Sequence, residues 1–316
     1  MTWKHIVLSA TAVLICACSG DPVADAAAQS TSSATQAAKP KVDAATQPEI
    51  GAELIRDNIY LLTGPGGNIG LSIGEDGAFV IDDKFARFGE QIIETVQSLT
   101  DAPIKFVINT HYHGDHTGAN AILKDTGATV IAHDNVRKRM GLTFENKLFG
   151  RTVDATSPEL WPTVTFSQSS TFHFNGQTVK VIHTPHAHTD GDSIIYFEGA
   201  NILHMGDNYF KGMFPYIDVD AGGSLQGMIK SHNQALSLAN ADTVIIPGHG
   251  ALANKTELTE TRDMLVTVQN RVDQRIKSGQ SLDDILADNI LDDLKSYVKF
   301  IDEEKMVRIS YRSLTK

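Results

Sequence analysis

The segment from residue 106 to residue 116 limits what this chain can fold into more than any other part of the sequence. The apolar run Phe106–Asn109 is typical of a buried strand, and it leads directly into Thr110-His111-Tyr112-His113-Gly114-Asp115-His116. Four imidazole or carboxylate groups thus follow one strand within six residues, and both groups are ligands of Zn²⁺. The alternative is a polar surface loop with chance histidines. Histidine is uncommon, however, and rigid scaffolds present functional side chains on such loops, so we predict a metal site.

Three later segments carry the same residue types beside predicted strands. They are His188-Thr189-Asp190-Gly191-Asp192 before Ser193–Phe197, Gly206-Asp207 after Ile202–Met205, and Pro247-Gly248-His249-Gly250 after Thr243–Ile246. Asp82 follows the apolar run Phe79–Ile81 in a similar way, and we predict that it orients a ligating histidine. His183 and His186 lie in the same stretch and are rivals of His188 as a ligand. The remaining histidines have no motif around them and are predicted to be structural or superficial: His133, His173, His204 and His232.

The cysteines limit the chemistry that the folded part can carry out. Only Cys16 and Cys18 are present, and both lie near the N-terminus. The rest of the chain can therefore form no disulfide and offers neither a cysteine nucleophile nor a thiolate ligand. A metal ion must be held by nitrogen and oxygen.

The N-terminal segment has the pattern of an export signal. Lys4 precedes the apolar run Ile6–Ala17, which is too short to span a bilayer as a mature helix. We interpret residues 1–18 as a lipoprotein-type signal peptide, cleaved before Cys18 with lipid on its sulfur; an ordinary cleaved signal is the alternative. Residues 19–48 are rich in Ala, Ser, Thr and Gln and predict a flexible linker. This predicts an exported protein in the periplasm or on the periplasmic face of a bacterial membrane.

Residues 49–316 predict one α/β (α+β) domain. Short apolar strands occur in two blocks, and helical periodicity appears within Ile92–Leu99, Leu225–Leu238 and Leu258–Ile276. A further short helix is expected near Thr117, and two more between residues 281 and 316. Two strand blocks with interspersed helices indicate two packed mixed β-sheets flanked by helices.

Taken together, these motifs resemble the metallo-β-lactamase fold superfamily. The HxHxDH motif, the HTDGD segment, the aspartate at a strand end and the PGHG segment occur in that family's order over roughly residues 60 to 250. The resemblance implies an αββα sandwich with two Zn²⁺ ions at one rim of the sheets. It also implies a ligand set for each ion: His111, His113 and His188 for the first, Asp115, His116 and His249 for the second, and Asp207 as the bridge between them. Di-iron redox relatives resemble this pattern but carry Glu in place of His113, so the all-histidine first site favours hydrolysis.

The resemblance also implies a reaction. Two Zn²⁺ ions can share a water and lower its pKa towards about 7, so that hydroxide attacks a carbonyl carbon. Asp115 is placed to orient that water and is the predicted catalytic residue. The predicted substrate is a small molecule, with a β-lactam as the first choice. A lactone or a thioester is the second choice, and a non-catalytic periplasmic scaffold is a remote alternative.

Three features bear on the substrate and partners. The best-known lactamase subclass has Cys where this chain has Asp207, and it has a substrate-gripping Lys three residues later. Here Lys211 lies four residues later, so a solvated lysine is the alternative. Residues 144–166 and the turn Gly64–Gly67 are candidates for lining the cleft, with plain surface loops as the alternative. The net charge of −11 disfavours nucleic acid, and no protein partner is predicted.

Overall fold

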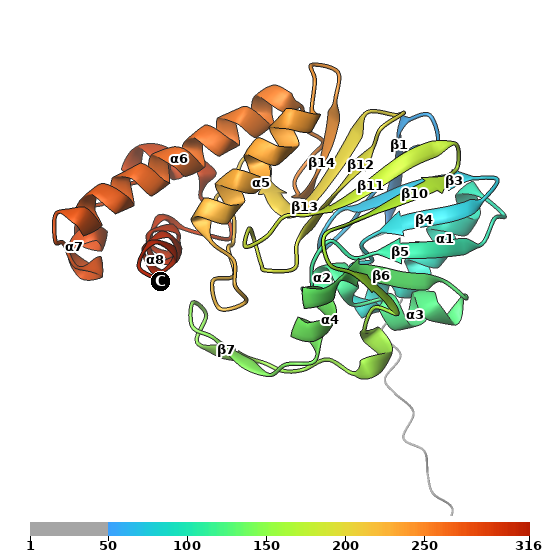
Figure 1. The fold of residues 1–316 in the computed structure, drawn as a ribbon, viewed down its shortest axis with the longest axis horizontal. Helices are drawn as coiled ribbons and strands as arrows, with labels where there is room; N and C mark the ends of the chain where they lie inside the picture. The colour runs from blue at the N-terminus through green and yellow to red at the C-terminus, as the bar shows by residue number, and fades with distance from the viewer. Residues whose placement is uncertain (1–49) are drawn as a thin grey trace, which may run out of the picture. The chain divides into compact units, whose positions relative to one another are not determined.

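Apolar residues in the first part of the domain build a seven-stranded mixed sheet (Figure 1). The computed structural model describes residues 50–316. The strand order is β1-β2-β3-β4-β5-β6-β9, antiparallel from β1 to β4 and parallel from β4 to β9. The strands are β1 Gly51–Arg56, β2 Ile59–Thr63, β3 Ile69–Gly74, β4 Gly77–Ile81, β5 Ile104–Ile108, β6 Thr129–His133 and β9 Val164–Phe166.

A five-stranded sheet follows, with the order β10-β11-β12-β13-β14. Its pairs are antiparallel except β13 with β14, which is parallel. The strands are β10 Ser169–Phe174, β11 Gln177–His183, β12 Ser193–Phe197, β13 Ile202–Phe210 and β14 Val244–His249. A separate hairpin is formed by β7 Phe144–Asn146 and β8 Arg151–Val153.

The alternation of side chains along the strands explains why the two sheets pack together. On β4, Phe79 and Ile81 point to the interface and join a cluster with Val181 and Phe197 of the second sheet. The intervening Ala78 and Val80 belong instead to the core on the opposite face. Both faces of this strand are therefore covered, which matches its continuous apolar sequence.

Helices cover the outer face of each sheet. Helices α1 (Gly89–Leu99) and α3 (Asn120–Asp125) share a core with the seven-stranded sheet, and α5 (Leu225–Leu238) and α6 (Lys255–Lys277) share one with the five-stranded sheet. The other helices are α2 Gly114–Thr117, α4 Asp134–Met140, α7 Leu282–Ala287 and α8 Glu303–Leu314, with 3-10 turns at Ala86–Phe88, Pro158–Leu160 and Asp292–Tyr297. The predicted αββα sandwich of two mixed sheets is confirmed (Figure 1).

The C-terminal helices build a core of their own beside the sandwich. Val268 of α6, Ile285 of α7 and Met306 of α8 pack in one cluster with Phe214 and Leu225. The cluster joins the C-terminus to the segment that follows β13. The two short helices expected between residues 281 and 316 are present, with a 3-10 turn between them.

The sequence did not predict several short elements. Strands β1, β7, β8, β9 and β10 and helix α4 were not expected, because half-exposed or three-residue segments carry little apolar periodicity. The helix expected near Thr117 begins at Gly114 instead. Asp115 and His116 therefore lie in a helical turn, in which the amides of His116 and Thr117 donate to the carbonyl oxygen of His113.

The predicted signal peptide, linker and lipidated Cys18 lie outside the described residues, and the domain boundary at residue 49 stays a prediction. Within residues 50–316, no helix combines the length and the apolar character that crossing a bilayer requires.

Candidate metal centre

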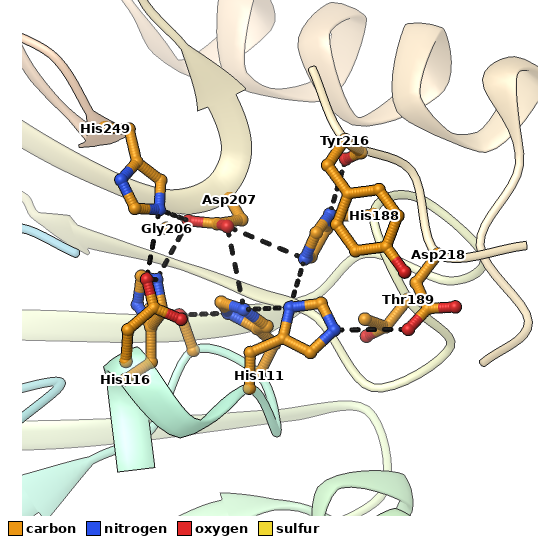
Figure 2. A network of polar contacts seen from close by, with 12 residues as sticks. His111, His116, His188, Thr189, Gly206, Asp207, Tyr216, Asp218 and His249 are labelled. Carbon is orange, nitrogen blue, oxygen red and sulfur yellow. Dashed lines mark hydrogen bonds and ion pairs between the residues drawn. The ribbon is translucent and has the colours of Figure 1, made fainter. Parts of the chain in front are cut away.

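The structure brings the seven predicted ligand residues together at one rim of the sandwich, where several strands end. His111 and His113 follow β5, His188 lies in the loop before β12, and His249 ends β14. Figure 2 shows His111, His188 and His249 around Asp207. Asp207 does not end its strand as predicted but lies within β13. The register of β13 against β14 is irregular around Gly206, which has a φ of +50°. This irregularity turns the Asp207 side chain towards the histidines.

Three histidines and one carboxylate oxygen form the first group. His113 Nδ1 lies 3.1 Å from His111 Nε2 and 2.9 Å from His188 Nε2. Asp207 Oδ2 lies 3.8 Å from His111 Nε2 and 3.6 Å from His188 Nε2. A tetrahedral zinc ion with bonds of about 2.05 Å would separate its nitrogen ligands by about 3.3 Å, so this spacing is close to what zinc requires.

The second group faces the other oxygen of the same aspartate. Asp207 Oδ1 lies 3.0 Å from His116 Nε2 and 3.4 Å from His249 Nε2. Asp115 Oδ2 lies 3.6 Å and 3.4 Å from the same two nitrogens. The two oxygens of Asp207 therefore separate two clusters of ligand atoms (Figure 2).

The hydrogen bonds of the first three histidines show that their ligand nitrogens are available. In each ring the other nitrogen donates to a protein oxygen, so the nitrogen that faces the cluster carries a lone pair. The acceptors are Thr110 Oγ1 for His111 Nδ1 at 3.0 Å, Asp218 Oδ2 for His113 Nε2 at 3.2 Å, and the Tyr216 carbonyl oxygen for His188 Nδ1 at 2.7 Å. Three lone pairs that point at one another are unfavourable unless a cation lies between them.

The burial and the charges of the ligand residues also favour a bound cation. Burial lowers the pKa of His188 to about 4, which keeps this imidazole neutral. Burial alone raises the pKa of Asp207, but His249, His116 and His111 outweigh it and hold the pKa well below its usual value. Asp207 Oδ1 and His116 Nε2 are both buried 3.0 Å apart, and outside the two ligand groups neither atom has a hydrogen-bond partner. A bound cation would satisfy both atoms, so the donor set fits a metal ion.

Asp82 supports histidines of both ligand groups. The sequence predicted only that it would orient one ligating histidine. Its Oδ2 lies 2.7 Å from His116 Nδ1 and 2.8 Å from Thr110 Oγ1, which in turn accepts from His111. Its Oδ1 accepts from the Thr110 amide at 2.7 Å. Asp82 is fully buried, so one carboxylate orients a histidine of each group.

Two glycines allow the backbone to approach the ligands closely. A Cβ at Gly67 would lie 2.1 Å from His116 Cε1, and one at Gly248 would lie 2.1 Å from Asp207 Oδ1. The GPGG turn and the PGHG segment therefore need glycine at these positions for steric reasons. The GPGG turn packs on His116 and is not among the residues that line the cavity.

Two residues near the site were not predicted. Asp218 accepts from Tyr112 Oη at 2.6 Å as well as facing His113, and the backbone of Tyr216 holds His188. The ring of Tyr216 also stacks on His113 with centroids 5.7 Å apart. No local motif marks either residue, and Asp218 lies 105 positions from His113 in the chain.

The rival histidines lie apart from both groups. His183 stacks on His133 at 3.7 Å between ring centroids, and His186 bonds to the carbonyl oxygen of Gly222. His204 and His232 are buried in contact with nearby backbone groups, and His173 lies on β10.

A cavity of about 840 Å³ opens beside the ligand residues. Part of the predicted 144–166 segment lines it, since Asn146, Phe149 and Arg151 belong to the β7–β8 hairpin at its wall. Lys211 is not among its lining residues in the described part of the chain. Its ammonium bonds to the Leu252 carbonyl oxygen at 2.7 Å and pairs with Glu257 at 2.8 Å.

Lys84 is fully buried beneath the site. Its shifted pKa predicts that the free energy of unfolding depends on pH. Burial lowers the pKa of Lys84 from 10.5 to about 8, although Asp115 and Asp82 oppose the shift. Between these values the unfolded chain binds more protons than the folded one, so stability rises with pH. From pH 8 to pH 10 this contribution amounts to about 2 kcal/mol. Urea unfolding at both pH values should show that Lys84→Met loses this rise relative to the wild type.

The exposed Lys230 of α5 supplies the control for this measurement, since Lys230→Met should keep the wild-type pH dependence. Equal changes between pH 8 and pH 10 in the wild type and in Lys84→Met would contradict the prediction.

Comparison with known proteins agrees with this geometry. The sequence profile of the metallo-beta-lactamase superfamily matches residues 62–249, which include every residue of both ligand groups. An "Uncharacterized protein" of Aquifex aeolicus is 30% identical over 176 residues, which make up 55% of this chain and 80% of that protein. The hydroxyacylglutathione hydrolase GloC of Haemophilus influenzae is 28% identical over 182 residues, or 56% of this chain and 82% of that protein.

A solved metallo-beta-lactamase from Pontibacter korlensis shares the fold. Its TM-score is 0.58 at 18% identity, and the match covers 69% of this chain and 99% of that one. The profile covers more than half of the chain, and the fold and ligand groups agree with it. This protein therefore belongs to the metallo-beta-lactamase superfamily and is a metal-dependent hydrolase.

Proposed function

We propose that this protein is a dinuclear zinc hydrolase that cleaves an activated acyl bond in a small molecule, with thioesters as the favoured class. The observation that carries the proposal is the position of Asp207, whose two oxygens face two separate clusters of ligand atoms. Nitrogen and oxygen donors in these numbers suit Zn²⁺. When bound, the ions would polarise the substrate carbonyl and lower the pKa of a water molecule.

Side chains of the protein would hold the ions and move the proton in the reaction. Asp207 would bridge the two ions, and His111, His113 and His188 would hold one of them, with His116 and His249 on the other. Asp115 lines the cavity and is partly exposed, unlike the buried Asp207. We assign to Asp115 the orientation of the attacking water and the acceptance of its proton.

Two observations support a thioester over the β-lactam predicted from the sequence. Hydroxyacylglutathione hydrolases, which act on thioesters, are among the relatives. Lys211 pairs with Glu257 outside the cavity lining, so it is not placed to grip a substrate carboxylate. A β-lactam remains the second candidate because a cavity of about 840 Å³ is large enough for a bicyclic drug.

Metal analysis and a substrate panel test the proposal. The full chain, stripped by a chelator and reloaded, should bind two zinc ions. It should hydrolyse a glutathione thioester with a kcat/KM at least tenfold above that for an acyl-homoserine lactone or a chromogenic cephalosporin. Faster turnover of the cephalosporin would establish the lactam alternative. An absence of chelator-sensitive turnover on all three would overturn the hydrolase assignment for these substrates.

We also propose that the protein is exported and anchored by lipid on Cys18, on the strength of residues 1–18 alone. Membrane fractionation of the wild type and of Cys18→Ala tests this. Release of only the variant from the membrane is the expected result, and equal fractionation of both would contradict lipidation.

A further inference from the structure

We propose that the apolar part of the cavity wall, formed by Phe149, Met213, Phe214 and Phe300, binds a neutral, bulky apolar acyl group of the substrate, and that Phe300 selects for that group. This inference rests on the proposed acyl-bond hydrolysis and names the part of the substrate that lies beyond the scissile bond. It is carried by the apolar lining of the cavity, by the charges there, and by an aromatic pair in that lining.

Apolar surface begins directly beside the ligand residues and continues outwards. The ring of Phe210 stacks on His249 with centroids 5.1 Å apart and planes 13° apart, and Tyr216 stacks on His113. The cavity wall also includes Met213, Phe214, Phe149 and Phe300. A substrate with its carbonyl at the ligand groups would therefore place its acyl substituent against these side chains.

The charged side chains of the cavity favour a neutral group. The Arg139 guanidinium is already engaged by Asp190, with bonds of 3.1 and 2.7 Å. Arg151 and Asp154 add one charge of each sign to the cavity lining. Apart from the ligand groups and Asp218, which is paired with His113, the lining therefore has no net charge to offer to an anionic or cationic substituent, and its rings favour an alkyl chain or an aromatic ring.

Two segments far apart in the sequence meet in the lining of the cavity. Phe149 connects β7 to β8, and Phe300 lies between the last 3-10 turn and α8. Their ring centroids are 5.5 Å apart with the planes at 34°. Both rings line the same cavity as the ligand residues His113, Asp115, Asp207 and His249.

Both segments are anchored, so the pair has a defined position. On the hairpin side, Asn146 Nδ2 donates to Tyr216 Oη at 2.5 Å, and the amide of Lys147 donates to Asp220 at 2.8 Å. On the C-terminal side, Ile301 is fully buried, and the amide of Phe214 donates to the Tyr297 carbonyl oxygen at 2.8 Å.

The Phe300 ring lines the cavity but is largely exposed to solvent, so a bound apolar group could cover it. Its exposed fraction is 65%, the largest among the large apolar side chains of residues 50–316 that are exposed. An apolar group that covers this ring gains hydrophobic free energy that a small acyl group cannot gain. Because the anchoring comes from neighbouring residues, removal of the Phe300 ring should change substrate choice without unfolding the chain.

A pair of thioesters with the same thiol tests the inference on the full, zinc-loaded chain. Phe300→Ala should lower kcat/KM for an octanoyl thioester about tenfold and for an acetyl thioester less than twofold. Leu54→Ala removes another exposed apolar side chain, 54% exposed on β1 and outside the cavity lining, and should change neither value. An unchanged octanoyl-to-acetyl ratio in Phe300→Ala would overturn the inference.

A binding measurement separates this inference from the proposed reaction. The neutral fluorophore N-phenyl-1-naphthylamine should bind the metal-free full chain, with a Kd at least fivefold weaker in Phe300→Ala and unchanged in Leu54→Ala. Equal binding by Phe300→Ala and the wild type would overturn the inference even if thioesters are hydrolysed. If the wild type hydrolyses neither thioester, the thioester proposal fails and the fluorophore alone decides whether the apolar site exists.

Discussion

Replacement of Asp207 by Ala is expected to lower kcat/KM for the preferred substrate on the order of a thousandfold or more, equivalent to roughly 4 kcal/mol of transition-state stabilisation. Its carboxylate is the group that faces both ligand clusters, at distances from 3.0 to 3.8 Å. Its loss would leave His116, His249, His111 and His188 without the anion that lies among them. The zinc content measured after dialysis should therefore fall from two ions per chain to one or fewer.

Asp154→Ala is the matched control, because it removes a carboxylate from the wall of the same cavity without touching either ligand group. That variant should keep two zinc ions and should change kcat/KM far less. Retention of two tightly held ions in Asp207→Ala would refute the bridging role, whatever happens to the rate.

Asp82→Asn is expected to weaken zinc binding about 10- to 100-fold. The carboxylate accepts from His116 Nδ1 and from both the amide and the hydroxyl of Thr110, which supports His111. An amide offers one oxygen in place of two, so its NH₂ group would face a donor, and one of the two histidines would lose its orientation. Competition with a chromogenic chelator measures the affinity, and the loss should appear at both zinc equivalents.

The neighbouring Asp83 provides a close control. It is equally buried and adjacent in sequence, but its Oδ1 accepts from the Ala119 amide at 2.9 Å and its Oδ2 has no hydrogen-bond partner. Burial raises the pKa of Asp83 well above its usual value, so the Asn variant is a nearly isosteric, neutral replacement. Asp83→Asn should bind zinc within about threefold of the wild type. An equal loss of affinity in both variants would mean that Asp82 acts only through the packing of this segment.

The sequence by itself predicted most of the ligand-type residues that the structure brings together, because they lie beside predicted strands, whereas the resemblance to the family divided them between two ions. His111, His113, Asp115 and His116 follow one buried strand, and His249 ends another. Buried strands can be predicted from their apolar runs. Because parallel strands end at a common rim of the sheet, polar side chains at several strand ends can be expected to meet. The same logic predicted that Asp82, directly after β4, would support a histidine.

Tertiary structure decided the features that depend on long-range contacts. The bond from His113 to Asp218 spans 105 positions, and no spacing rule predicts which acidic residue of the later segment reaches that ring. Asp207 was placed at a strand end, yet β13 continues to Phe210, and only its irregular pairing with β14 aims the carboxylate inwards. The role left open for Lys211 was decided by its ion pair with Glu257.

The walls of the cavity also depend on long-range contacts. Phe149 and Phe300 contact each other because a short hairpin and the C-terminal helices are packed against the segment after β13. A three-residue strand and an exposed phenylalanine have no periodicity that indicates their partners. Ligands at strand ends are determined by residue type and by neighbours in the chain, so they could be predicted from the sequence. The cavity walls are determined by packing between segments far apart in the sequence, so they could not be predicted.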